Sequence, residues 1–591
     1  MTQGRGALAR RLGRLPTIVR TVRHLRFAQA VAQLHHALFG IGSPRSVAGA
    51  APDLAIEAPA APFLPPPAHV KYLGGQRFEL LATPFEAPRG AGWAQTVHGP
   101  LFAYHLHQHE WLRCAGVSPE VRAAILLDWI QSNPSGIGWD PHPTGLRLLA
   151  WGKLLTTAGS LPDDAALRTE LLRAFADQAE TLSQGLEIRL QANHLLSNLL
   201  CVVFAGLLVD SPASTAWRAR SDLLLEELAR QIHADGGHEE RSPMYHAALL
   251  EGVLDVLDLC RARPERAPTG LEAGLVGTAA RMQRALERLC HGDGRIALFA
   301  DSAFDVAPEP AALRAQATQL GVPLEEGRAQ RPIGSGSGAA AGASAPAGPV
   351  RGSARLPQTG YVRLEQGDWL LLASVAGPAP AHQPGHAHCD ALAFELSFAG
   401  HRLVTDTGVF EYRAGPRRER ARATASHATI AIDGEEQAEI WSAHRVGGRP
   451  VVTLVDGGDD GFAEATCRGW SRPRTLHRRR FRVDARGVEI EDTVEGPARA
   501  LRTCLPIDPG WSVELRTGDR SNDRDTASTS AICRRIGEPE LVVEIELPDA
   551  FAWHVEEGVC FPSFGREVRR PVLVGLGRAC TAARTRIHRI A

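Results

Sequence analysis

Apolar residues recur at three- and four-residue spacing across most of residues 100–300, which is typical of helices that bury at least one face. This pattern predicts helices over residues 121–133, 144–155, 167–182, 194–209, 216–232, 245–260 and 275–290. Turn-forming stretches such as 133–136 and 234–237 separate them. Because several of these helices are apolar on most sides, we expect them to pack on both faces, in a multi-helix ring or superhelix.

The hydrophobic period changes from about 3.6 to 2 near residue 355, which indicates a switch from helices to strands. Alternating segments predict strands within 361–375, 391–398, 401–407, 428–433, 478–494 and 541–548, with no helical run between them. The sequence thus predicts an α+β multidomain chain. Its expected parts are a basic, helical leader (1–50), a helical domain (51–325), a low-complexity linker or loop (326–356) and an antiparallel β domain (357–591).

The bulk composition is that of an ordinary globular protein, with 44% hydrophobic residues, 22% charged residues and a net charge of −1. No global field therefore attracts nucleic acid, and no uninterrupted apolar stretch predicts a transmembrane segment. Eight arginines precede the first acidic residue, Asp53, without the apolar core of a standard signal peptide. Residues 15–39 predict a basic amphipathic helix, docked on the protein, lying on a membrane or serving as a transit peptide. Periplasmic and cytoplasmic locations, and the oligomeric state, stay open.

A histidine-rich stretch at 382–427 carries the clearest candidate chemistry. His388, Asp406 and His427 lie on or beside three successive predicted strands, so their nitrogen and oxygen donors can converge on a zinc ion. His386 and Tyr412 would then be proton-transfer groups beside the metal. A chain with 23 histidines also produces His-x-His by chance. The ten cysteines contain no Cys-x-x-Cys pair and indicate neither a disulfide scaffold nor a thiolate zinc site.

Three polar clusters interrupt the predicted helices. Aromatic and basic side chains at 132–151 could line a sugar groove or simply pack at helix ends; they are Trp139, His142 and Arg147. Asn193 and His194 begin an apolar helix, where they could meet an anionic substrate or only cap the helix. The charged stretch 235–246 contains Glu239, Arg241 and Tyr245. A buried tyrosine acts as a base only where positive charge lowers its pKa.

Together, these stretches resemble the heparinase II/III family of polysaccharide lyases, which includes alginate lyases. The matching segments follow the family's order and are residues 102–112, 133–151, 193–198, 235–246, 386–400, 405–412, 425–434 and 477–496. The resemblance implies an incomplete (α/α) toroid followed by an antiparallel β-sandwich. Residues 416–424 carry arginines where the family often has aromatic residues, so these arginines either contact an anionic polymer or indicate a different substrate.

The resemblance also implies residue roles. Asn193 and His194 would neutralise a uronate carboxylate, Tyr245 would be the catalytic acid, and in some members also the base, and His386 would be a second base. Tyr412 would lie near the active site. Zinc on His388, Asp406 and His427 would brace the sheet beside the cleft. Trp139, His142, Arg147, Glu239 and Arg241 are the expected substrate-binding residues.

The expected function is cleavage of an anionic, uronate-containing polysaccharide by β-elimination, in which the C5 proton is removed and the C4 oxygen leaves. Glycosaminoglycan, alginate and bacterial capsule all present uronates, and the sequence does not distinguish them. Two alternatives remain: a uronate C5 epimerase, which returns the proton, and a non-catalytic carbohydrate-binding protein in exopolysaccharide synthesis. No carboxylate pair stands out as the acid and nucleophile of a glycosidase.

Overall fold

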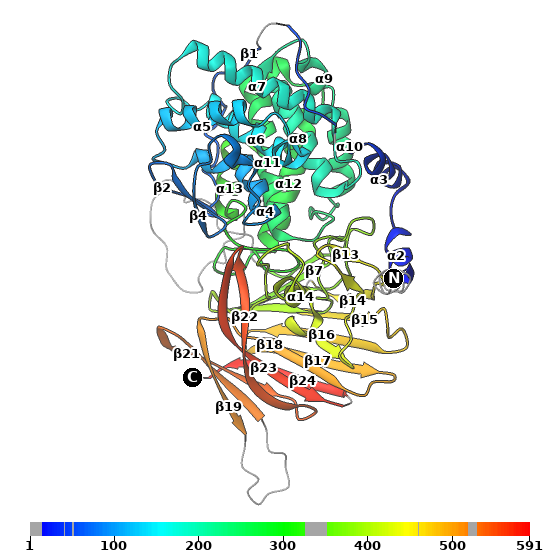
Figure 1. Cartoon of the computed structure of the whole chain (residues 1–591). Coiled ribbons are helices and arrows are strands. Elements are labelled where there is room, and N and C mark those ends of the chain that lie inside the picture. The colour runs from blue at the N-terminus through cyan, green and yellow to red at the C-terminus, as the bar shows by residue number, and fades with distance from the viewer. Residues whose placement is uncertain are drawn as a thin grey trace, which may run out of the picture.

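The computed structural model describes residues 15–40, 42–49, 52–324, 352–458, 460–517, 529–578 and 580–590. Helices make up most of the first half and antiparallel strands most of the second, and the two halves stack end to end (Figure 1). Mixed helix and sheet content therefore agrees with the predicted α+β class. Of the predicted linker, only residues 352–356 are described, and the last three form strand β6 (Ala354–Leu356).

The helices follow the predicted periodicity closely. They are α4 (Pro100–Gln108), α5 (Pro119–Ser132), α6 (Pro141–Leu155), α7 (Ala165–Gln184), α8 (Ala192–Leu208), α9 (Ser214–Arg218), α10 (Ser221–Gln231), α11 (Pro243–Ala262), α12 (Leu271–Arg288) and α13 (Pro310–Gln319). The prediction of a single helix over 216–232 is wrong, because the helix is interrupted between α9 and α10. Two leader helices, α2 (Leu15–Val22) and α3 (Phe27–Phe39), lie at the side of the molecule where the two halves meet (Figure 1).

Local sequence explains where the site-bearing helices begin. Ser242 caps α11 by accepting a hydrogen bond from the Tyr245 amide, and Pro243 occupies the first helical position. Helix α8 starts after Gln191, whose φ of 59° turns the chain sharply into the helix. Asn193 is therefore the second residue of α8 and does not cap it. Both helices bring polar residues in their first turn to the end of the helical half that faces the strands.

Two predictions about where strands and helices occur are wrong. The predicted all-helical region contains a three-stranded sheet of β2 (Val70–Gly74), β3 (Arg77–Leu80) and β4 (Thr83–Glu86), and a short pair of β1 (Asp53–Leu54) with β5 (Val209–Asp210). The strand half contains a short helix, α14 (Pro416–Arg422). Strands β1–β5 and helix α14 are each too short to show a clear period in the sequence.

Three main antiparallel sheets form the second half. The five-stranded sheet has the order β10-β9-β8-β7-β6, from β7 (Tyr361–Gln366), β8 (Trp369–Ser374), β9 (Phe394–Phe398) and β10 (His401–Val404). The eight-stranded sheet has the order β14-β15-β16-β17-β24-β21-β20-β19, from β14 (Val451–Gly457), β15 (Phe462–Arg468), β16 (Leu476–Asp484), β17 (Gly487–Glu495), β19 (Trp511–Thr517), β20 (Thr529–Arg535), β21 (Glu538–Leu547) and β24 (Cys580–Arg589). The four-stranded sheet has the order β11-β18-β23-β22, from β11 (Ile430–Ile432), β18 (Leu501–Pro506), β22 (Ala552–Ser563) and β23 (Arg566–Gly577). A short hairpin joins β12 (Ile440–Trp441) to β13 (Arg445–Val446).

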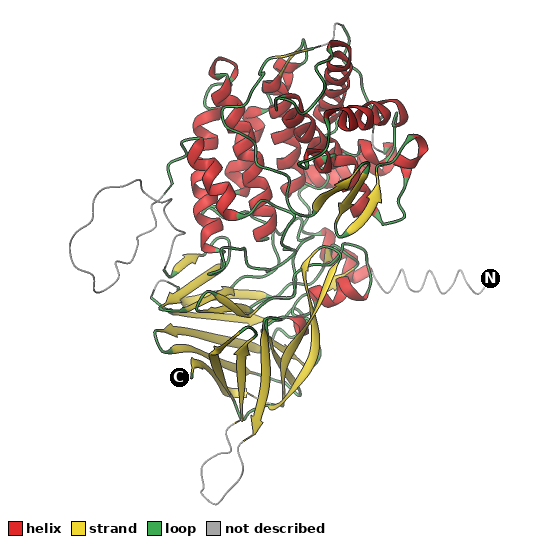
Figure 2. Ribbon diagram, turned by 90° about the vertical axis from the view of Figure 1, so that its left-hand side faces the viewer, coloured by secondary structure: helices red, strands yellow, loops and turns green. Residues whose placement is uncertain are grey.

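The five-stranded sheet is the middle layer (Figure 2). One face shares an apolar cluster with the eight-stranded sheet, and the other packs on α12 and the segment after it through Tyr361, Leu372 and Phe299. Strand β9, predicted to be half-buried, is therefore buried on both faces. Its polar residue Glu395 lies 2.7 Å from His291 Nε2 and accepts a hydrogen bond from the Asp406 amide. These contacts fix β9, which follows the segment that carries His382, His386 and His388, the histidine-rich loop.

Among the described helices, none combines the length and the apolar character that crossing a bilayer requires.

Candidate active site

Asp301 organises the histidine-rich loop, although sequence analysis did not single it out. Its carboxylate lies 2.8 Å from His386 Nδ1 and 2.9 Å from His388 Nε2, and Arg418 from α14 donates to both of its oxygens. Burial by itself raises the pKa of Asp301, but the Arg418 charge and the two histidine contacts outweigh it and hold that pKa well below its usual range. Asp301 is therefore an ionised, fully buried anchor for three cationic or polar groups.

Two tyrosines lie beside His386. The Tyr245 and Tyr412 hydroxyl oxygens are 2.6 Å apart, and the Tyr245 ring centre is 4.3 Å from that of His386. Burial raises the pKa of both phenols; for Tyr245, the hydrogen bond with Tyr412 only partly offsets this effect. Both tyrosines consequently keep their protons at neutral pH, and Tyr245 is suited to donate a proton rather than to abstract one.

A second ionisable group lies at the start of α8. His194 Nδ1 is 3.0 Å from Glu187 Oε2, and the His142 ring centre is 4.8 Å from that of His194. Burial lowers the pKa of His194, but the charge and hydrogen bond of Glu187 outweigh it, so the net pKa is raised. The pKa of Glu187 is lowered to about 2, and burial lowers that of His142 to about 4. The arrangement favours an imidazolium on His194 beside a neutral His142.

Glu240 connects the two groups. Its Oε1 accepts a hydrogen bond from the Asn193 amide at 3.0 Å, and its Oε2 lies 3.9 Å from His386 Nε2. Glu240 is 2% exposed, and burial raises its pKa. Through Glu240, the start of α8 with Asn193 and His194 is linked to His386 of the strand half.

The predicted zinc ligands lie together, but their ligand atoms are not all within 4.8 Å of one another. His427 Nδ1 is 2.7 Å from Asp406 Oδ1, and the His388 and His427 ring centres are 5.4 Å apart. All three residues are buried, and each has one polar atom without a hydrogen-bond partner: His388 Nδ1, Asp406 Oδ2 and His427 Nε2. Orphaned buried donors of this kind are chemically suited to a zinc ion. Among described residues, ligand atoms within 4.8 Å of one another occur instead in His142–Glu187–His194 and in Asp301–His386–His444.

Two expected substrate-binding residues lie in the helical core. Arg147 is fully buried, and its guanidinium donates to Gln178 at 2.6 Å and to the His107 carbonyl at 2.8 Å. Trp139 is partly buried, and its indole donates to the Asn133 carbonyl at 2.6 Å. The expectation for Arg147 is not supported, because its donors are already used inside the protein; of that predicted groove, only His142 lies beside the cluster.

The charged pair predicted before α11 also has internal partners. Arg241 donates to the Thr359 carbonyl at 2.7 Å and to the Gly360 carbonyl at 2.9 Å, so it joins the helical half to the strands instead of contacting a substrate. Glu239 is 7% exposed and lies 3.2 Å from Arg230. Burial raises the pKa of Glu239 to about 7.

The arginines of residues 416–424 divide between the interior and the surface. Arg418 and Arg422 are each 1% exposed and bind Asp301 and backbone carbonyls, so they do not contact a polymer at the surface. Arg417 and Arg420 are exposed. Glu187, Glu240, Asp301 and Arg418 are thus the functional neighbours that sequence reasoning missed. Glu240 and Arg418 gave a signal, since they lie within the charged stretch 235–246 and the arginine-rich residues 416–424, whereas Glu187 and Asp301 gave none.

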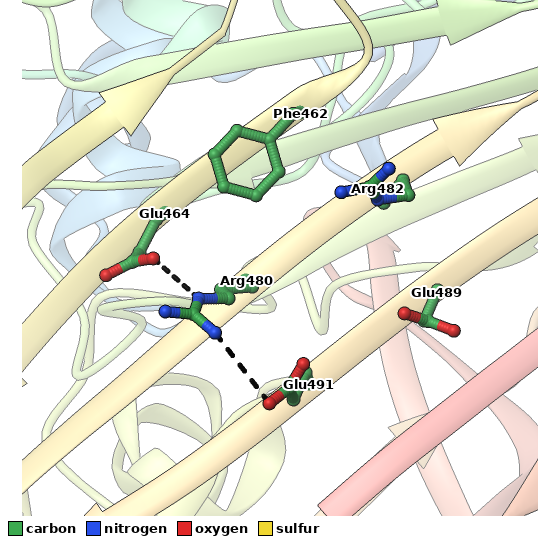
Figure 3. Close-up of a pocket in the computed structure, with 6 residues that line it drawn as sticks. All are labelled: Phe462, Glu464, Arg480, Arg482, Glu489 and Glu491. Atoms are coloured by element: carbon green, nitrogen blue, oxygen red, sulfur yellow. Dashed lines mark hydrogen bonds and ion pairs between the residues drawn. The ribbon is translucent and has the colours of Figure 1, made fainter.

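A separate hollow lies on the outer face of the eight-stranded sheet. Strands β15, β16 and β17 line it with Phe462, Glu464, Arg480, Arg482, Glu489 and Glu491 (Figure 3). Arg480 Nε donates to Glu464 at 2.6 Å and Arg480 Nη1 lies 3.9 Å from Glu491, so the charged side chains of the hollow pair with one another. None of the site residues comes from these strands, and we assign the hollow no part in the chemistry.

Comparisons with known proteins identify the family. A family model described as "Heparinase II/III N-terminus" matches residues 123–305, and one described as "Heparinase II/III-like, C-terminal" matches residues 348–582. FtsZ-localized protein C of Caulobacter vibrioides is 25% identical over 428 residues, which cover 68% of each chain. Heparin-sulfate lyase of Pedobacter heparinus is 26% identical over 341 residues, 52% of this chain and about half (47%) of the lyase.

Solved structures show the same fold. A crystal structure of heparinase III gives a TM-score of 0.66 at 16% identity, covering 86% of this chain and 81% of the other. A mutant of heparan sulfate lyase HepC from Pedobacter heparinus gives 0.54 at 18% identity, covering 88% and 81%. With the two family models spanning most of the sequence, the chain belongs to the heparinase II/III family.

Proposed function

We propose that this protein is a polysaccharide lyase that cleaves a uronate-containing anionic polymer by β-elimination. In this reaction the C5 proton moves to a base, a C4–C5 double bond forms, the C4–O4 bond breaks, and O4 receives a proton. The observation that carries the proposal is that Tyr245 packs on His386 and that Glu240 links His386 to the Asn193 amide at the start of α8, next to His194. Family membership supports lyase chemistry at this coarse level. We also propose that the helical half is an incomplete (α/α) toroid and the strand half a β-sandwich.

Asn193 and His194 would bind the uronate carboxylate. Removal of the C5 proton places negative charge on that carboxylate, and a donor aimed at developing charge contributes about 3 kcal/mol. The raised pKa of His194 supplies an imidazolium for this purpose. Glu187 holds that imidazolium in place from the side of Nδ1, which leaves Nε2 for the substrate.

His386 would be the base that takes the C5 proton. Because Asp301 is ionised, His386 Nδ1 must donate to it, and the neutral ring then presents Nε2 as an acceptor. Asp301 also stabilises the imidazolium that forms when Nε2 accepts the proton. Positioned proton transfer of this kind contributes about 10²–10⁴-fold to a rate.

Tyr245 would be the acid that protonates the departing O4. Its raised pKa keeps the phenol protonated, and the proton that His386 takes from C5 can return to the adjacent Tyr245 after turnover, which restores both groups. The adjacent placement of the Tyr245 and His386 rings puts acid and base within reach of neighbouring atoms on one sugar.

We further propose that His388, Asp406 and His427 hold a zinc ion, which would supply fixed positive charge and brace the strands next to His386. Purified protein is then expected to contain about one zinc per chain, because three buried donors lack protein partners. His427→Ala should remove the metal and lower the melting temperature, as measured by elemental analysis and calorimetry. His554→Ala is the matched control, because the His554 side chain is 44% exposed and lies outside the cluster. Stoichiometric zinc in His427→Ala would contradict the assignment.

Substrate affinity is expected to fall as pH rises through the raised pKa of His194. Its charged form is fully present below that pKa and is lost above it, so KM should increase on the alkaline side while kcat changes less. Glu187→Gln removes the main group that raises the pKa, and the increase in KM should move to lower pH. The measurement is KM against pH for both proteins. An identical profile in Glu187→Gln would show that another group governs binding.

The proposed activity is tested by incubating the protein with a panel of polyuronates and following the near-ultraviolet absorbance of the 4,5-unsaturated product. Absorbance that grows with at least one polymer is the expected result. Solvent deuterium entering C5 without chain cleavage would instead identify an epimerase.

A second candidate is a non-catalytic carbohydrate-binding protein. The alignment with FtsZ-localized protein C, a relative whose name states a location and no lyase activity, covers 68% of this chain, compared with 52% for the alignment with the lyase. Binding of a polyuronate without double-bond formation or deuterium uptake would favour this candidate and overturn the lyase proposal.

A further inference from the structure

The two leader helices dock on the protein through their polar sides. On α2, Thr17 donates to Glu439 at 2.8 Å, Arg20 Nε donates to the same carboxylate at 2.7 Å, and Thr21 accepts a hydrogen bond from the Trp441 indole at 3.1 Å. These residues recur at three- and four-residue spacing, so they form one face of the helix. That face attaches α2 to the strand half.

Helix α3 also docks through its polar side, and it contacts both halves. Gln29 is 1% exposed and donates to the His382 carbonyl at 3.4 Å, and Gln33 donates to the Arg189 carbonyl at 3.0 Å. Arg26, which precedes the helix, donates to Gln191 at 3.1 Å. Helix α2 is thus held by hydrogen bonds and an ion pair with Glu439, and α3 by hydrogen bonds.

The apolar sides of both helices face outward. Large side chains on these sides keep much of their surface exposed: Leu15 55%, Ile18 39%, Val19 56% and Val22 47% on α2, and Phe27 86%, Val31 52%, Leu34 62%, Leu38 68% and Phe39 72% on α3. Leu15, Ile18, Val19 and Val22 on α2, and Phe27, Val31, Leu34 and Leu38 on α3, recur at three- and four-residue spacing and form continuous stripes; Phe39 lies beside the end of the second. An amphipathic helix normally buries its apolar stripe against the protein; here that orientation is reversed, which leaves an apolar surface for another medium.

Charge identifies that medium. Eight arginines and no acidic residue precede Asp53, and Arg23, between the two helices, is exposed. A basic segment with an outward apolar stripe has the chemistry of a helix that lies in the interface of a bilayer rich in anionic lipid. We propose that α2 and α3 bind the surface of an anionic bilayer, with the apolar stripes entering the acyl boundary.

This attachment would place the candidate active site near the bilayer. Helix α3 rests on residues 189–191, which lead directly into Asn193 and His194, and on His382 at the start of the histidine-rich loop. In Figure 1 both helices lie on one side, at the junction of the two halves. A bilayer bound there would hold the protein with that junction close to the lipid surface.

Vesicle sedimentation with the full chain tests the proposal. Vesicles of equal parts phosphatidylglycerol and phosphatidylcholine should pull down the protein at least about tenfold more strongly than phosphatidylcholine alone. Phe27→Asp/Leu34→Asp puts charge in the stripe and should lower binding by at least about tenfold. The matched control, Val451→Asp/Ile536→Asp, adds the same charge at residues that are 65% and 61% exposed on the strand half, and should bind like the wild type.

Three results would overturn the proposal. The first is wild-type protein that stays in the supernatant with both vesicle types. The second is a leader variant, Phe27→Asp/Leu34→Asp, that binds the anionic vesicles as well as the control, Val451→Asp/Ile536→Asp. The third is a light-scattering measurement without lipid in which the wild-type protein self-associates while the leader variant is monomeric. That result would assign the apolar stripes to contact with a second copy of the chain. None of these measurements depends on lyase activity.

Discussion

Replacing Tyr245 with phenylalanine is expected to lower kcat for elimination by about 10²–10⁴-fold, because the departing O4 loses its positioned proton donor. The ring, its contact with His386 and the packing of α11 remain, so substrate affinity and the melting temperature should change little. The measurement is the rate of unsaturated product formation on the polymer that the panel identifies, together with the KM for that polymer.

The control for this substitution is Tyr72→Phe. The Tyr72 hydroxyl lies on β2 and donates only to the Gly75 carbonyl at 3.3 Å, so its removal should leave turnover unchanged. Tyr412→Phe should reduce kcat by less than Tyr245→Phe, because it removes only the partner hydroxyl at 2.6 Å. Full activity in Tyr245→Phe would contradict its assignment as the acid and would direct attention to another donor in the cluster.

Replacing Arg418 with methionine is expected to lower the free energy of unfolding by about 3–5 kcal/mol, because it leaves the buried Asp301 carboxylate without its charged partner. The Arg418 side chain is 1% exposed, so solvent cannot replace the lost contacts. The measurement is urea-induced unfolding, and the pH should be held constant so that the ionisation of Asp301 is comparable between proteins.

Arg417→Met is the matched control, since it changes the neighbouring residue of the same short helix in the same way. Its side chain is 50% exposed and pairs with Glu567 at the surface, so the free energy of unfolding should change by no more than about 0.5 kcal/mol. Equal, small effects of the two substitutions would show that Asp301 does not depend on Arg418 for its charge.

The hydrophobic periods predicted most elements well because each depends on local spacing. Helices α5–α8, α11 and α12 and strands β7–β11 occur within the predicted segments or extend a few residues beyond them. Periodicity failed where an element was too short to show a period, as in α14, and it did not show that β9 is buried on both faces. The fold class and the family were therefore readable from the chain.

Site residues were harder to predict than elements. Three arginines lie in polar stretches of the sequence that would suit an anionic ligand. All three, Arg147, Arg241 and Arg418, are nevertheless buried and bind internal carbonyls or carboxylates. The sequence does not show whether a charged side chain finds its partner inside the protein or in a ligand. That distinction requires burial, which depends on how distant segments pack.

The sequence by itself determined the order of helices and strands, the family and the residue types of the candidate site, because these follow from local spacing and local motifs. Only the tertiary structure decided that Asp301 anchors His386 and His388 from a loop 85 and 87 residues away. It also decided that the leader helices turn their apolar stripes outward. Both results depend on contacts between segments far apart in the chain, and such contacts leave no periodic signal in the sequence.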